Sequence, residues 1–135
     1  MIAQKKIANG TSRTFKKILI VEDDPDQRKF LSYLFKKSGY EVYGAGDGEE
    51  GLNMARKERP DLVILDLRLP KCPGEEVCKA IREDQDKGFA HTPIVMLTGK
   101  TADVDRVIGN VIGASSYLTK PFHTADLLEQ VGRFL

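Results

Sequence analysis

Short apolar runs recur along the chain, and each one leads into polar or charged residues. The clearest runs, at 18–21, 62–65 and 94–97, are four residues long. Runs this short, set off by residues such as Pro60 and Pro70, are typical of strands buried on both faces of a parallel sheet. With two weaker runs they predict five strands, at 17–21, 40–45, 62–66, 93–98 and 114–118.

Between and after these strands the apolar residues follow a helical period instead. The segment before the fifth strand is the clearest case, although Gly109 interrupts it; its apolar residues are Val104, Val107, Ile108, Val111 and Ile112. Such spacing places them on one face of a helix. Five strands alternating with five helices predict a (βα)5, doubly wound parallel five-stranded sheet of the flavodoxin-like kind. The strand order 2-1-3-4-5 fits best.

Composition is that of a single folded domain. The chain has 135 residues, 41% of them hydrophobic, with 21 basic and 20 acidic side chains. We expect residues 1–15 to form a flexible basic leader and residues 16–135 to form the domain. No apolar run approaches the roughly 20 residues of a membrane helix, and no signal peptide is visible. These features predict a cytoplasmic protein that does not associate with membranes.

Polar side chains follow the predicted strands at the point where each one ends. These residues are Asp23 and Asp24 after the first strand, Asp66 after the third, Thr98 after the fourth and Lys120 after the fifth. The carboxyl ends of parallel strands line one crevice. Carboxylates there repel one another by about 4 kcal/mol per pair at ~4 Å if the effective dielectric constant is ~20. A cation must offset this repulsion, and oxygen ligands of this kind suit Mg²⁺.

The same group of residues predicts phosphoryl chemistry. A carboxylate such as Asp66, held near Mg²⁺, a lysine and a hydroxyl donor, can attack phosphorus and become an aspartyl phosphate. Lys120 and Thr98 supply the ammonium and the hydroxyl. A glycine-rich turn that would cradle a nucleotide is missing after the first strand, where acidic residues stand instead.

Each of these residues also has a purely structural interpretation. Asp24 precedes Pro25 and could simply cap a helix. Asp66 could end a strand, Thr98 could be an ordinary β-branched strand residue, and Lys120 could be a solvated surface charge.

Four segments at these strand ends resemble one known family. They are ILIVEDD at 18–24, DLRLP at 66–70 followed by Gly74, PIVMLTG at 93–99 and GASSYLTKPF at 113–122. In this order they are similar to the receiver domains of two-component response regulators, including the single-domain chemotaxis-type regulators. The resemblance extends over residues 16–135.

The resemblance implies a role for each site residue. Asp66 would be the phosphoacceptor and Asp24 a direct Mg²⁺ ligand, with Asp23 acting through water or as a supporting carboxylate. The backbone carbonyl of Arg68 would be a further ligand. Thr98 and Lys120 would bind the phosphoryl oxygens. Pro121, which is preceded by a cis peptide bond in the family, would shape the loop that carries Lys120.

The implied function is a phosphoryl-accepting signalling switch rather than an enzyme. A sensor histidine kinase or a histidine phosphotransfer protein would be the donor. Tyr117 would turn inward on phosphorylation and alter the surface of the fourth helix, fifth strand and fifth helix, where a target protein or output domain docks. By family analogy the first helix would face the donor, with these side chains outward: Gln27, Arg28, Ser32 and Lys36. We expect no direct nucleic acid binding by this chain.

Two other functions remain open at this point. One is a receiver-like interaction module that never takes phosphate. The other is an enzyme that turns over an aspartyl phosphate, as haloacid-dehalogenase phosphatases do. Those enzymes carry an aspartate two residues after the nucleophile, where this chain has Arg68.

Overall fold

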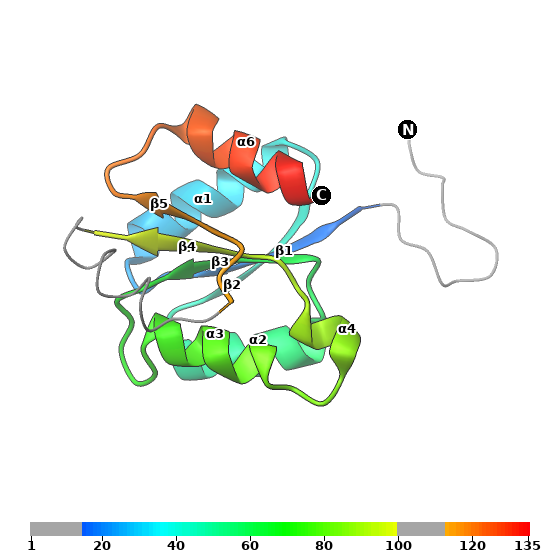
Figure 1. Cartoon of the computed structure of the whole chain (residues 1–135). Helices are drawn as coiled ribbons and strands as arrows, with labels where there is room; N and C mark the ends of the chain where they lie inside the picture. The colour runs from blue at the N-terminus through cyan, green and yellow to red at the C-terminus, as the bar shows by residue number, and fades with distance from the viewer. Residues whose placement is uncertain (1–14, 100–112) are drawn as a thin grey trace.

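A five-stranded parallel sheet forms the centre of the computed structural model, which describes residues 15–99 and 113–135 (Figure 1). The strands are β1 (Lys17–Val21), β2 (Glu41–Ala45), β3 (Leu62–Asp66), β4 (Ile94–Thr98) and β5 (Ser116–Thr119). They pair in the order β2-β1-β3-β4-β5, and every pairing is parallel. The predicted doubly wound sheet and its strand order are therefore confirmed.

Helices cover both faces of the sheet. The described helices are α1 (Pro25–Lys37), α2 (Gly48–Glu58), α3 (Gly74–Arg82), α4 (Lys87–Ala90) and α6 (Thr124–Phe134). Figure 1 shows α1 and α6 on one face and α2 and α3 on the other. The helix predicted from the apolar spacing between Val104 and Ile112 lies outside the described residues. Within the described ranges, no helix combines the length and the apolar character needed to cross a bilayer.

The short helix α4 was not predicted from the sequence. Asp86 caps it by accepting hydrogen bonds from the amides of Gly88 and Phe89, and Phe89 is buried against the core. Four residues make about one turn, which is too short to produce a helical period in the apolar pattern.

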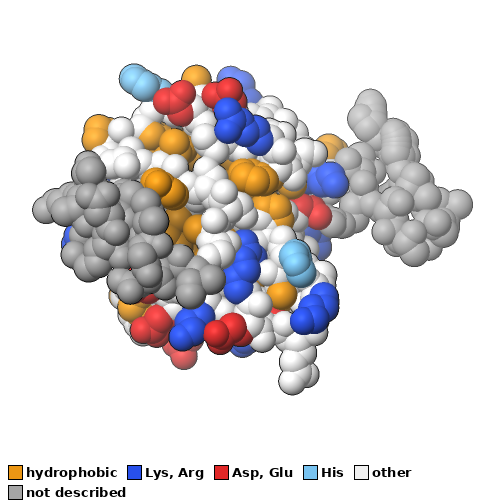
Figure 2. Space-filling view, viewed as in Figure 1, with side chains coloured by type: hydrophobic (Ala, Val, Ile, Leu, Met, Phe, Trp, Pro, Cys, Tyr) orange, Lys and Arg blue, Asp and Glu red, His pale blue; other side chains and the backbone are white. Residues whose placement is uncertain are grey.

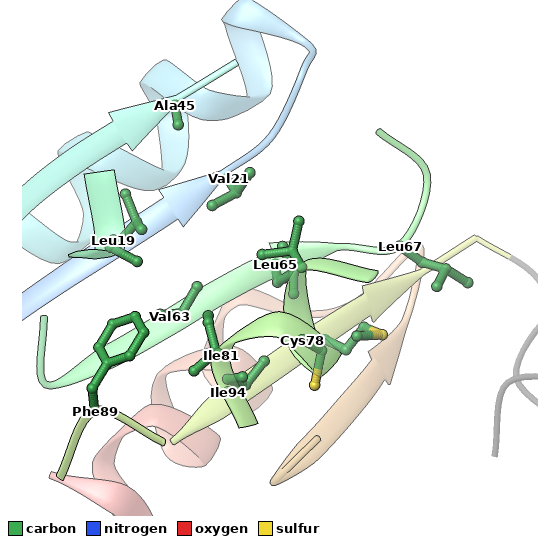
Figure 3. Packing of buried hydrophobic residues seen from close by; sticks show 13 residues of the cluster. Leu19, Val21, Ala45, Val63, Leu65, Leu67, Cys78, Ile81, Phe89 and Ile94 are labelled. Atoms are coloured by element: carbon green, nitrogen blue, oxygen red, sulfur yellow. The ribbon is translucent and has the colours of Figure 1, made fainter. Parts of the chain in front are cut away.

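Alternate residues of β1 point to opposite faces of the sheet and divide the core in two. Ile18 and Ile20 belong to the cluster that includes side chains of α1 and α6. Leu19 and Val21 belong to the cluster on the other face, which includes side chains of α2 and α3 (Figure 3). All five residues of β3, including its last residue Asp66, are buried. This burial accounts for the continuous apolar run at 62–65.

The strand register brings the residues that follow the strands to one edge of the sheet. Val21 pairs with Leu65, and Leu97 pairs with Asp66. Glu22 comes directly after Val21 and Thr98 directly after Leu97, so both residues follow strand positions close to Asp66. Helix α3 starts tightly against this edge. A Cβ atom at Gly74 would lie 2.3 Å from the carbonyl oxygen of Asp66, so only glycine allows this approach.

Candidate functional site

Three carboxylates meet at the carboxyl edge of the sheet. Glu22 and Asp23 follow β1, and Asp66 ends β3; one oxygen from each lies within 4.8 Å of the others. Glu22 is 2% exposed and Asp66 is 6% exposed, whereas Asp23 faces solvent. The site therefore combines two buried acids with one that solvent can reach.

Lys120 provides a positive charge beside the two buried acids of this group. Its Nζ donates hydrogen bonds to Asp66 Oδ2 at 2.8 Å and to Glu22 Oε1 at 3.1 Å. Lys120 follows β5, its backbone amide donates to the Thr98 carbonyl, and the Lys120–Pro121 peptide bond is cis. The structure thus brings together Lys120 and Asp66, which are 54 residues apart in the chain.

The pKa values of Glu22 and Lys120 reflect this crowding. Burial, followed by repulsion from Asp66, raises the pKa of the Glu22 carboxyl above its usual value. Desolvation alone would lower the pKa of Lys120. The hydrogen bonds and charges of Asp66 and Glu22 outweigh that effect and raise the Lys120 pKa. The two acids therefore favour the charged form of the lysine.

Thr98 ends β4 with a buried hydroxyl group. The side chain is 1% exposed, and within residues 15–99 and 113–135 its Oγ1 has no hydrogen-bond partner. Leaving a buried hydroxyl unsatisfied costs about 1–3 kcal/mol. Thr98 comes one residue after Leu97, the partner of Asp66 in the sheet. An acceptor atom arriving beside Asp66 would satisfy this hydroxyl.

Asp24 has a different position from the one expected of a direct metal ligand. Its Oδ1 accepts hydrogen bonds from the amides of Asp26 and Gln27, which makes it the N-cap of α1. It is exposed and does not belong to the acidic group described above. The structural interpretation of Asp24 as a helix cap is confirmed.

Glu22 is the site residue that sequence analysis did not single out. Two signals could have found it. The first strand ends at Val21, so Glu22 is the first residue beyond it, and Pro25 at the first helical position assigns the cap to Asp24. Together they indicate that Glu22 and Asp23, rather than Asp23 and Asp24, lie beside Asp66.

Arg68 lies in the loop after β3, and Tyr117 lies on β5. The amide of Arg68 donates to Asp66 Oδ1 at 3.1 Å, so the main chain at Arg68 turns back toward the acid.

Tyr117 on β5 is 45% exposed, with its ring outside the core. Figure 2 shows apolar side chains across the middle of the face on which β5 lies.

The donor set fits a magnesium ion. Mg²⁺ prefers oxygen ligands, typically one or two carboxylates completed by waters and phosphate oxygens. Asp23 and Asp66 offer carboxylate oxygens within the required reach of each other, and Asp23 is open to solvent. Nitrogen and sulfur ligands, which softer metals prefer, do not contribute to this group.

Sequence comparison identifies one family. Residues 18–132 match the family model of the response regulator receiver domain. The alkaline phosphatase synthesis transcriptional regulatory protein PhoP of Bacillus subtilis (strain 168) is 43% identical over 120 residues. The match covers 89% of this chain and 48% of that protein, so this chain spans about half the length of that relative.

Solved structures show the same fold. Chemotaxis response regulator CheY4 of Vibrio cholerae is 38% identical, with a TM-score of 0.80 and coverage of 90% of this chain and 100% of that one. Response regulator TrrA of Thermotoga maritima, solved in complex with Mg²⁺ and BeF, is 32% identical with a TM-score of 0.78. That match covers 90% of this chain and 100% of TrrA.

Replacing Lys120 should destabilise the fold in a pH-dependent manner. In Lys120→Met the pKa of Glu22 rises further, because the lysine normally lowers it. An acid whose pKa is higher in the folded than in the unfolded protein destabilises the fold when it is ionised. This loss of unfolding free energy therefore appears as the pH rises and is absent at low pH. We expect the variant to lose about 1 to 3 kcal/mol of unfolding free energy at about pH 8, because the buried acids lose a hydrogen-bond donor, and less at about pH 5.

Urea unfolding in the presence of a chelator at both pH values measures this difference. Lys29→Met is the matched control, since Lys29 is an exposed lysine on α1. Its effect should be small and similar at both pH values. A loss in Lys120→Met that does not change with pH would contradict the charge-balancing role of Lys120.

Proposed function

This chain belongs to the response regulator receiver domain family, and we propose that it is a phosphoryl-accepting switch with Asp66 as the acceptor. Receiver domains of two-component systems are signalling phosphoacceptors rather than conventional enzymes. One observation carries the proposal for this chain. Asp66 is buried at the carboxyl end of β3, with a lysine ammonium 2.8 Å from its carboxylate.

The proposed magnesium ligands are Asp23, Asp66 and the backbone carbonyl of Arg68. Glu22 supports the site from the buried side through its hydrogen bond to Lys120. The direct ligand in this proposal is Asp23 rather than Asp24, because Asp24 caps α1. Once bound, Mg²⁺ would supply the positive charge that offsets the clustered carboxylates and the incoming phosphoryl oxygens.

The side chains of the site have complementary parts in phosphoryl transfer. One carboxylate oxygen of Asp66 attacks the phosphorus of a phosphohistidine on the donor protein. The P–N bond breaks, and its electron pair leaves with the imidazole nitrogen. Lys120 Nζ and Thr98 Oγ1 then donate hydrogen bonds to phosphoryl oxygens. This arrangement would give the buried Thr98 hydroxyl an acceptor.

Signal output would follow from the movement of Thr98. Drawing its hydroxyl toward the phosphoryl group frees space into which Tyr117 turns from its exposed position. That turn changes the surface of β5 and α6 and of the helix predicted at 104–112, which lies outside the described residues. A sensor histidine kinase or histidine phosphotransfer protein is the proposed donor, and a target protein or output domain docks on the changed surface.

Incubation with acetyl phosphate, followed by intact mass measurement, tests the proposed function. We expect one phosphoryl group on the wild type with Mg²⁺, and none on Asp66→Asn or in the presence of a chelator. Asp66→Asn keeps the shape of the side chain and removes the nucleophile, which makes it the matched control.

Two results would change the assignment. Addition to Asp66→Asn would place the acceptor elsewhere. If the wild type gains no mass at early times and also fails to bind beryllofluoride, the chain would instead be a phosphate-independent interaction module.

Two isosteric variants test which acid holds the metal. Asp23→Asn should weaken Mg²⁺ binding by about tenfold or more, because it removes a charged ligand. Asp24→Asn should bind Mg²⁺ like the wild type and remain equally stable, since asparagine caps helices as well as aspartate does. Amide chemical shifts followed during a Mg²⁺ titration give both dissociation constants. The reverse order of effects would restore Asp24 as the ligand.

A further inference from the structure

Arg28 reaches from α1 to the end of β1, where the acidic residues begin. Its Nη1 donates a hydrogen bond to the main-chain carbonyl of Glu22 at 2.7 Å. The side chain is half-buried, so it does not have the outward position expected for a residue of a donor-facing surface. Its partner is a backbone oxygen, at the peptide group that links Glu22 to Asp23.

This carbonyl lies just beyond the regular sheet. The register of β1 ends at Val21, which pairs with Ala45 on one side and with Leu65 on the other. The Glu22 amide still donates to the Ala45 carbonyl at 3.0 Å. Arg28 supplies the donor for the Glu22 carbonyl. Glu22 is thereby held at both its amide and its carbonyl, and the direction in which Asp23 leaves the strand is defined.

The end of β2 leaves room for the arginine side chain. A Cβ atom at Gly44 would lie 3.3 Å from Arg28 Cδ, and one at Gly46 would lie 3.3 Å from Arg28 Nη1. The side chain therefore lies closely over two positions that have no side chain of their own. This contact restricts the rotamers of Arg28 and directs its guanidinium to the Glu22 carbonyl.

From this geometry we infer that Arg28 is a positioning residue for the Mg²⁺ site, an inference that rests on the proposed function. It contacts neither the ion nor the phosphoryl group. It holds the Glu22–Asp23 peptide so that the Asp23 carboxylate faces Asp66. Outer partners that orient a ligand in this way commonly change metal affinity tenfold or more when they are removed.

Whether removal of Arg28 weakens or strengthens Mg²⁺ binding distinguishes a positioning role from a purely electrostatic one. Arg28 places a positive charge near a site that binds a cation, so its removal would strengthen Mg²⁺ binding if charge alone mattered. A positioning role predicts weaker binding. Arg28→Met is the informative variant, because it keeps an apolar chain over Gly44 and Gly46 while removing both the charge and the donor.

The test is an amide chemical-shift titration of the full chain with MgCl₂. We expect the Mg²⁺ dissociation constant of Arg28→Met to rise by roughly threefold to tenfold, with the lost charge opposing part of the effect. Arg28→Lys, which keeps the charge on a shorter side chain, should give an intermediate value. Lys29→Met, which removes an exposed charge on the same helix, should bind as tightly as the wild type or more tightly.

The possible outcomes distinguish this inference from the proposed function. Unchanged or tighter binding in a folded Arg28→Met would overturn the positioning role and leave the proposed function intact. If Arg28→Met does not fold, wild-type affinity in Arg28→Lys would overturn it. A wild-type chain without saturable Mg²⁺ binding would overturn both.

Discussion

Negative charge concentrated at one end of the sheet is the constraint on which the rest of the site depends. Glu22 and Asp66 are almost completely buried, and Asp23 lies beside them at the surface. Such a group is unfavourable unless positive charge reaches it. In the described structure Lys120 supplies this charge, by hydrogen bonds to both buried acids. The same crowding that makes these acids costly favours binding of a divalent cation, which is the role proposed for Mg²⁺ here.

The parallel sheet is what makes this concentration possible. The site residues follow or end four strands, β1, β3, β4 and β5, and the register aligns those ends at one edge. The strands are held by apolar clusters on both faces, so the positions of the site residues are set by a rigid core. Thr98 has the least satisfied side chain of the group, because its buried hydroxyl lacks a partner among the described residues. This hydroxyl and the shared lysine are the donors that the proposed function assigns to the phosphoryl oxygens.

The apolar pattern was sufficient to predict the sheet, its order and the edge where the candidate site lies. It predicted Asp66, Thr98 and Lys120 as neighbours because polar residues directly follow buried runs. It could not decide among three consecutive acids, since Glu22, Asp23 and Asp24 differ only in where the strand stops and the helix cap begins. The short helix α4 escaped prediction because one turn has no detectable period. The bond from Arg28 to a backbone carbonyl also left no trace in the pattern, because it depends on the conformation of a loop.

A crystal structure of the full chain with Mg²⁺ and beryllofluoride would test the central claim most directly. We expect the fluoroberyllate on Asp66, the ion on the carboxylates of Asp23 and Asp66, and Thr98 Oγ1 donating to a fluorine atom. Lys120 should contact another fluorine atom. An ion bound by Asp24, or a Thr98 hydroxyl that still lacks a partner beside the bound anion, would contradict the account.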